Sequence, residues 1–215
     1  MKLRCFGLII CFAICSIVCS GCGSKLNIND FLTQYNSMGQ VYSITKTIEY
    51  TIDEHNLFNK QIFQRDYKDD SLIVRYTETN KSLNQITLDD TRLYNTTTKD
   101  MYYYNNQVGE VVNNQIIWRA GLLEEITGLW GGGKRDLTAS YFEKIVVDNE
   151  NYTLTADVKM DYYDRVLSDT VEQLKVTFDM DEQKRLNTVI FSYYVGQRAF
   201  LQTLEFGYEE VEIVI

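Results

Sequence analysis

The chain has 215 residues, a formal net charge of −9 and five cysteines, and every cysteine falls within the first 22 positions. The acidic balance, without any block of basic residues, argues against nucleic-acid binding through phosphate neutralisation and against polybasic docking onto anionic lipids. The cysteine distribution argues against a disulfide framework or a cysteine-rich zinc site in the remainder of the chain.

The amino terminus has the three-part layout of an export signal. Lys2 and Arg4 precede an uncharged and mostly apolar run over residues 5–19, and two small residues follow before Cys22. This order, basic then apolar then small, is typical of a secretory signal peptide. The apolar run is shorter than the roughly 20 residues that a membrane-spanning helix needs. We therefore expect the chain to be exported.

The last residues of this signal carry a family resemblance. The sequence Val18-Cys19-Ser20-Gly21-Cys22 resembles the lipobox of bacterial lipoproteins, although Cys19 stands where leucine is usual. In that family the final cysteine is linked through its sulfur to diacylglycerol and becomes the first residue of the mature protein. The resemblance therefore implies lipid attachment at Cys22.

Lipidation at Cys22 implies a domain organisation and a location. Residues 1–21 would be the signal peptide, residues 22–29 the lipidated cysteine with a short tether, and residues 30–215 a single domain. Acylation would also protect the one thiol that remains after cleavage from oxidation. Because two acyl chains hold a protein stably on a bilayer, we expect a lipid-anchored protein on the extracytoplasmic face of the cell membrane. An uncleaved transmembrane anchor and plain secretion are the alternatives.

The first element expected in the domain is a helix. Apolar residues recur at helical spacing from residue 28 to residue 38, which predicts a helix over about residues 30–38. Asn29 or Asp30 would cap its first turn, and Gly39 would end it.

The pattern then changes to the alternation of apolar and polar residues that predicts strands with one buried face. Tyr50 and Ile52 belong to the first alternating run. Turn-forming sequences at Lys68-Asp69-Asp70, Asn80-Lys81 and Asp89-Asp90 separate later runs. The strands predicted in this part cover about residues 42–53, 58–67, 71–79, 83–89, 92–96, 101–104 and 110–113.

A second helical zone interrupts the strands. A wide apolar face over residues 115–129 predicts a helix, which the glycines at 131–133 would end. A possible short helix lies near residues 161–169. The remaining strands are predicted at about residues 141–148, 152–160, 172–180, 186–195 and 199–214.

The predicted fold class is α+β and mainly β. Proline is absent from the whole chain, so every strand is free to donate hydrogen bonds along its length. Strands linked by short turns pair antiparallel. We therefore expect one large curved antiparallel sheet with two or three helices packed on one face.

This order of elements resembles the LolA-like group of bacterial envelope proteins that carry lipids. In that group a curved half-barrel of antiparallel strands is crossed by helices, and the space between them takes acyl chains. The resemblance covers the element order over most of the mature chain, and no residue motif supports it. It implies a half-barrel fold and a lipid ligand, and it transfers no ligand-contacting residue to this chain.

Motifs for catalysis, metals and nucleotides are weak in this sequence. His55 is the only histidine and is expected in a polar turn. The sequence from Gly128 to Arg135 matches the start of a phosphate loop, but it lacks the Ser or Thr that follows the lysine. The residues from Asp179 to Glu182 resemble the opening of a calcium loop, but Lys184 stands where that motif needs glycine. We expect no enzymatic activity, no cofactor and no metal.

Two functions remain open at this stage. A large curved sheet needs much apolar volume behind it, and the few predicted helices leave room for a cavity, with Tyr50, Ile52, Leu123, Ile126 and Trp130 as candidate lining. The protein would then bind or carry a lipid or acyl chain. The alternative is that these residues fill a solid core and that the protein binds another envelope protein.

Overall fold

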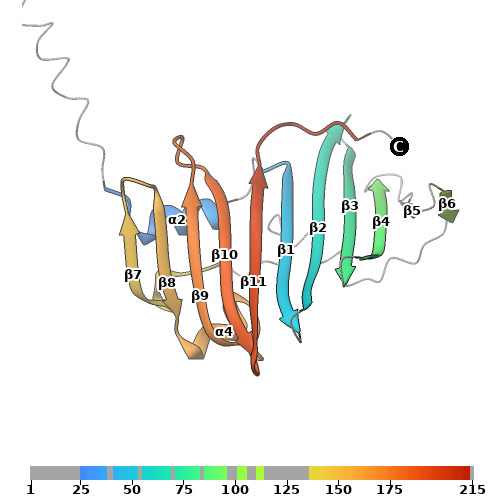
Figure 1. The fold of residues 1–215 in the computed structure, drawn as a ribbon. Helices are drawn as coiled ribbons and strands as arrows, with labels where there is room; N and C mark the ends of the chain where they lie inside the picture. The colour runs from blue at the N-terminus through green and yellow to red at the C-terminus, as the bar shows by residue number, and fades with distance from the viewer. Residues whose placement is uncertain are drawn as a thin grey trace, which may run out of the picture.

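The computed structural model describes residues 25–37, 41–52, 55–68, 71–82, 85–95, 101–105, 110–113 and 136–213. These residues form one antiparallel sheet of eleven strands, crossed on one face by short helices (Figure 1). The strands are β1 (Ser43–Ile52), β2 (His55–Lys68), β3 (Ser71–Ser82), β4 (Gln85–Asn95), β5 (Met101–Asn105), β6 (Glu110–Asn113), β7 (Phe142–Asp148), β8 (Thr153–Val158), β9 (Glu172–Met180), β10 (Leu186–Val195) and β11 (Arg198–Gly207).

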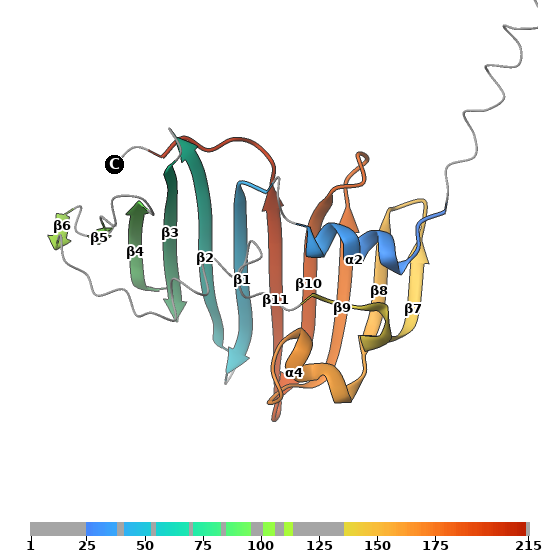
Figure 2. The same ribbon diagram turned by 180° about the vertical axis from the view of Figure 1, so that it is seen from behind.

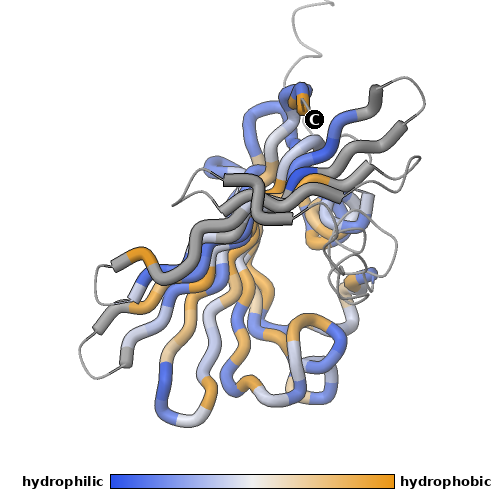
Figure 3. The backbone as a smooth tube through the Cα atoms, turned by 90° about the vertical axis from the view of Figure 1, so that its right-hand side faces the viewer, coloured by the Kyte–Doolittle hydropathy of each residue, from blue (hydrophilic) through white to orange (hydrophobic). Residues whose placement is uncertain are grey.

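The sheet consists of two meanders that meet in its middle. Its strand order is β6-β5-β4-β3-β2-β1-β11-β10-β9-β8-β7, so the first and the last strands of the chain are neighbours. The pairing of β1 with β11 extends from Ser43 opposite Gly207 to Tyr50 opposite Phe200. Figure 3 shows that the strands rotate and that the sheet curves without closing, as expected from the right-handed twist of strands. The predicted fold class, a large curved antiparallel sheet with helices on one face, is confirmed.

Helix α2 (Ile28–Asn36) crosses β8, β9 and β10 (Figure 2). Its cap is Asn27, whose side-chain oxygen accepts the Asn29 backbone N–H at 2.9 Å. The Asp30 carboxylate accepts the Asn27 backbone N–H at 2.7 Å, which completes a capping box. The helix therefore starts two residues before the predicted residue 30, and its N-cap is Asn27, the polar residue before Ile28. Of the two predicted capping residues, Asn29 does not cap the helix, whereas Asp30 contributes the second hydrogen bond of the capping box.

The face of the sheet under α2, here called the covered face, carries the hydrophobic core. Phe178 on β9 is fully buried and contacts three rings, with centroid distances of 6.4 Å to Phe31, 5.9 Å to Tyr35 and 6.3 Å to Phe142. A second covering element, formed by the 3-10 helix η2 (Met160–Tyr162) and helix α4 (Tyr163–Val166), lies on the same side (Figure 2). The short helix predicted near residues 161–169 is therefore present.

Two predicted turns lie inside strands. Asp89 and Asp90 are paired in β4 with Thr79 and Glu78 of β3, so the strands predicted at 83–89 and 92–96 form one strand. The turn predicted at Asn80-Lys81 was also wrong, because β3 continues to Ser82. Local turn propensity was overridden at these positions by pairing with neighbouring strands.

The last predicted strand is shorter than expected. β11 ends at Gly207, and residues 208–213, here called the C-terminal segment, cross the end of the sheet without strand pairing (Figure 1). Ile213 is buried beside Leu93 and Val211, and its backbone N–H donates to the Asp66 carboxylate at 2.9 Å. This contact forms a second, small apolar cluster on the outer face of the sheet.

Several predictions lie outside the described residues, namely the helix at 115–129, the glycines at 131–133 and the whole amino-terminal signal. Within the described part of the chain, no helix has the length and apolar character needed to cross a membrane. The same residues contain no group of three His, Cys, Asp or Glu side chains placed to hold a metal ion.

Candidate ligand-binding groove

A groove opens where the two meanders separate. Beyond Tyr50 and Phe200, β1 continues only beside β2, and β11 begins only beside β10. The groove has a volume of about 470 Å³ and is open to solvent. Its described lining consists of Glu49, Tyr50, Thr51, Leu57, Phe58, Ser192, Ala199, Phe200 and Leu201.

A row of stacked rings forms one wall of this groove. Tyr50 and Phe200 are paired across β1 and β11, and their centroids lie 4.8 Å apart with an interplanar angle of 24°. Phe200 is also paired with Tyr193 of β10, at 5.3 Å and 5°. Leu57 of β2 extends the row, because it is paired with Tyr50. Directly paired residues point to the same face, so this row continues the covered face toward β2.

The stacked rings are partly shielded from water. Tyr193 is buried, and burial raises the pKa of its hydroxyl. Tyr50 and Phe200 are half-buried. The row therefore lies at the boundary between the closed core and solvent, where an apolar ligand would remove the remaining exposed ring area from water.

The opposite wall belongs to the outer face of the sheet. Glu49 is paired with Leu201 on one side and with Phe58 on the other. Leu201 is 40% exposed although it is a large apolar residue. The groove thus combines apolar side chains from both faces with a single described charge, the Glu49 carboxylate.

A second cavity of about 180 Å³ lies between α2 and the turn that joins β9 to β10. Its described lining is mixed, with Asp30 and Lys184 beside Leu26 and Met180. This volume is below the roughly 300–1,000 Å³ of most small-molecule sites. The larger groove is therefore the better candidate.

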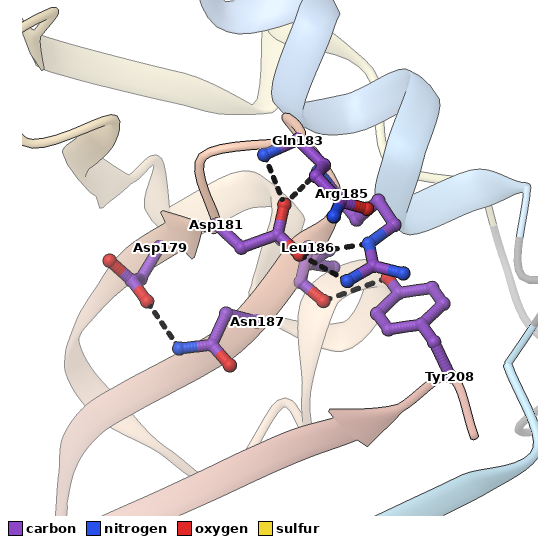
Figure 4. Close-up of polar contacts among 7 residues, drawn as sticks. All are labelled: Asp179, Asp181, Gln183, Arg185, Leu186, Asn187 and Tyr208. Atoms are coloured by element: carbon purple, nitrogen blue, oxygen red, sulfur yellow. Dashed lines mark hydrogen bonds and ion pairs between the residues drawn. The ribbon is translucent and has the colours of Figure 1, made fainter.

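The turn between β9 and β10 is structural, as Figure 4 shows. One Asp181 carboxylate oxygen accepts the backbone N–H groups of Gln183 and Arg185, both at 2.9 Å, and the other accepts Arg185 Nε at 2.8 Å. Burial alone would raise the pKa of Asp181, but these hydrogen bonds and the Arg185 charge lower it below its usual value. The carboxylate is therefore committed to its own turn, and the hairpin interpretation of this sequence is confirmed over the calcium-loop interpretation.

Arg185 also connects this turn to the start of the C-terminal segment. Its guanidinium lies 4.6 Å from the centroid of the Tyr208 ring. The Tyr208 hydroxyl donates to the Leu186 carbonyl at 2.8 Å (Figure 4). These contacts hold the chain in place as it leaves β11.

One of the five predicted cavity residues is found in the groove. Tyr50 lines it, whereas Ile52 ends β1 with its backbone paired to His55 and its side chain outside the described part. The other three predicted lining residues and the predicted lipid-attachment residue lie outside the described residues, and they are Leu123, Ile126, Trp130 and Cys22.

Sequence analysis did not find Phe200, Tyr193 and Leu57. Each lies at an apolar position of an alternating run, and this alternation is the sequence pattern that could have indicated a shared face with Tyr50. The pairing of β1 with β11, about 150 residues later in the chain, brings Phe200 beside Tyr50. No local pattern in the sequence specifies that pairing.

Comparisons with known proteins are weak. No family model and no curated protein matches the chain. Among solved structures, LprF from Mycobacterium bovis is similar with a TM-score of 0.39 and 12% identity, over 88% of this chain and 97% of that chain. MucB in complex with MucA(peri) is similar with a TM-score of 0.36 and 11% identity, over 86% of this chain but 57% of that chain. Because both TM-scores are below 0.5, the fold is described from the strand pairing within this chain and not from these two structures.

Proposed function

We propose that this protein is a lipid-anchored extracytoplasmic lipoprotein that binds a hydrophobic ligand, a lipid or an acyl chain, without transforming it. The observation that carries the proposal is the groove of about 470 Å³ lined by the stacked rings of Phe200 and Tyr50, with Tyr193 stacked behind Phe200. This volume lies within the roughly 300–1,000 Å³ typical of small-molecule sites. The resemblance of the element order to the LolA-like group points to the same ligand class.

The position of the groove supports a binding role. The covered face of β7 to β10 is closed by α2 and by η2 with α4, and its side chains form a continuous core. At Tyr50 and Phe200 the same face reaches solvent. Burying the exposed parts of these rings under an apolar chain contributes about 25 cal/mol per Å² of area removed from water.

The first test is to identify what the protein carries. The lipoprotein is purified from membranes, extracted with organic solvent, and the extract is analysed by mass spectrometry. We expect a stoichiometric lipid or fatty acid besides the anchor, and we expect Phe200→Ala to lower its amount by about tenfold, because burial of a phenylalanine side chain contributes roughly 1.5–3 kcal/mol.

A matched control removes a stacked ring elsewhere. Tyr141 stacks on Tyr162 at 4.5 Å and 22°, away from the groove lining. Tyr141→Ala should therefore leave the extracted ligand unchanged. A wild-type protein that is repeatedly empty, or equal loss in both variants, would contradict the proposed ligand site.

The anchor is tested separately by metabolic labelling with a radioactive fatty acid such as palmitate. Cys22→Ala should abolish the label and release the protein from the membrane fraction. Label that survives the substitution would rule out lipidation at this residue.

A protein-binding role is the second candidate, and exposed apolar residues favour it. Tyr194, Val195 and Leu201 are 41%, 38% and 40% exposed on or beside the β10–β11 hairpin. The β7 edge is less suited to strand addition, because an irregularity between Glu143 and Val146, with Lys144 at a φ of 50°, interrupts its ladder. Site-specific crosslinking from position 194 in intact cells would give a defined protein adduct if this second function is correct.

A further inference from the structure

We infer that the tip of the β10–β11 hairpin and the adjacent η2 helix dock onto a lipid surface, as a second membrane contact at the end of the sheet opposite the amino-terminal anchor. This inference rests on the proposed lipid anchor at Cys22. It gives the groove a fixed orientation, because the groove lies at the same end as the docking tip.

The exposed apolar residues of this end carry the inference. Met160 is 77% exposed, and Tyr194 and Val195 are 41% and 38% exposed. Figures 1 and 2 place η2 with α4 beside the β10–β11 hairpin at one end of the sheet. These side chains come from two separate turns, so they form isolated protrusions that a fluid lipid phase can accommodate individually.

Charged neighbours accompany these protrusions. Lys159 precedes Met160, and Arg198 is paired with Val195. Long basic side chains beside apolar ones extend to lipid headgroups while the apolar residue enters the acyl region, and tyrosine is enriched at the same interface. Lys159 Nζ already donates to the Ser140 carbonyl at 2.8 Å, which leaves Arg198 as the more available of these two cations.

Acidic residues in the same region define the type of lipid. The segment from Lys159 to Glu172 and the β10–β11 turn contain the anions Asp161, Asp164, Asp169 and Glu172 and the cations Lys159, Arg165 and Arg198, and the Glu49 carboxylate lies at the same end, in the groove. A mixed set without positive excess suits zwitterionic headgroups, and the chain as a whole carries a net charge of −9. The surface that the hairpin tip binds is therefore a zwitterionic bilayer, and this binding should depend little on salt concentration.

The other end of the molecule fixes the geometry. The backbone N–H of Leu26 donates to Asn149 Oδ1 at 2.6 Å, in the turn between β7 and β8. Cys22 precedes Leu26 by four residues, so the lipid would attach within about 14 Å of this turn. Strands β10 and β11 have ten residues each, which corresponds to about 33 Å. Contacts at both ends would hold the strands along the bilayer and the groove at its surface.

The test uses the lipidated protein in phosphatidylcholine vesicles. After cleavage and acylation, Val195→Cys introduces the single reactive thiol, which is labelled with the environment-sensitive fluorophore NBD. We expect a blue shift of NBD emission and quenching by lipids that carry a nitroxide on the acyl chain. Ile86→Cys is the matched control, because Ile86 is an apolar residue that is 48% exposed but lies on β4 of the other meander, away from both the hairpin and the anchor, and its probe should report water.

The outcomes separate the inference from the proposed function. If the protein sediments with vesicles but the probes at 195 and 86 behave alike, the docking inference is wrong and the anchor stands. If the protein does not sediment, lipidation itself is wrong. Quenching in isolated vesicles indicates docking on the anchoring bilayer and supports the inference, whereas quenching only in clustered vesicles indicates docking on a second bilayer and contradicts the inferred orientation. A Tyr194→Ser and Met160→Ser double variant should abolish either signal.

Discussion

The two meanders of the sheet, one around β9 and the other around β2, share the same alternation of side chains but differ in the chemistry of their covered face. On β9, the covered face presents Leu174, Val176, Phe178 and Met180, and all four are buried. On β2, the equivalent face presents Asn59, Gln61 and Arg65 together with apolar residues, and Arg65 is buried. The comparison teaches that strand periodicity predicts which residues share a face, whereas the chemistry of that face depends on what packs against it.

Polar side chains on β2 need partners that the apolar side chains of β9 do not need. The Asn59 side-chain amide donates to Asn80 Oδ1 across the β2–β3 pair. The Arg75 guanidinium donates to Gln64 Oε1 at 2.7 Å on the outer face of the same strands. Stability on the β2 side therefore depends on directional contacts and on the small cluster around Ile213, and stability on the β9 side on dense apolar packing.

The largest expected effect tests the packed side. Phe178→Ala removes a ring that contacts Phe31, Tyr35 and Phe142, and it should lower the free energy of unfolding by about 3–5 kcal/mol. Urea denaturation followed by circular dichroism measures this loss. Phe58→Ala, at a half-buried position on the outer face of β2, is the matched control and should cost clearly less. Equal losses of unfolding free energy in the two variants would contradict the proposed difference between the β9 and β2 parts of the sheet.

The next effect tests the C-terminal segment. Ile213→Ala opens a cavity beside Leu93 and should cost about 2–5 kcal/mol locally. Because this cluster is separate from the main core, hydrogen exchange should accelerate in β2, β3 and β4 and remain slow in β8, β9 and β10. Uniform acceleration across both sides would show that the sheet unfolds as one unit.

A smaller effect tests the capping box of α2. Asn27→Ala removes the acceptor for the Asn29 backbone N–H and should cost about 1 kcal/mol. Asn27→Asp retains an acceptor and should cost less, because a carboxylate is also favourable at a helix amino terminus. The midpoint of urea denaturation measures both, and equal costs would show that the side-chain acceptor contributes little.

The smallest effect near neutral pH concerns Tyr35, which burial keeps protonated. Burial raises the pKa of this hydroxyl above the ordinary value of 10.0. In the unfolded chain the hydroxyl ionises near pH 10, whereas in the folded protein it ionises only at higher pH, so its contribution to stability is complete below about pH 10 and is lost as the pH rises above that value. Tyr35→Phe should flatten that decline in alkaline urea titrations. An unchanged slope would assign the decline to other groups.

Much of the fold was predictable because its signals are local. The alternation around Tyr50 predicted β1 within a residue at each end, and the spacing of Phe31, Leu32 and Tyr35 predicted a helix with one buried face. Asp89 and Asp90 misled the prediction, since adjacent acids favour turns in isolation but were placed in a strand by their pairing with β3.

The groove was predictable only in part. Tyr50 was a candidate because of its size and its place on an apolar face, but a core position and a groove position have the same pattern in sequence. Whether a residue lies in the core or in the groove depends on which strand pairs with β1, where that pairing ends, and which helices cover that part of the sheet.

The sequence by itself determined the alternation of strand faces, the amphipathic first helix, the absence of proline, and the basic, apolar and small-residue order that ends at Cys22. Each of these depends on residues a few positions apart, and so on local backbone geometry. Only the tertiary structure decided that β1 pairs with β11, that this pairing ends at Tyr50 and Phe200, and that Met160, Tyr194 and Val195 are exposed at one end. These features depend on contacts between residues far apart in the chain, and the energy of such contacts is not present in any local segment.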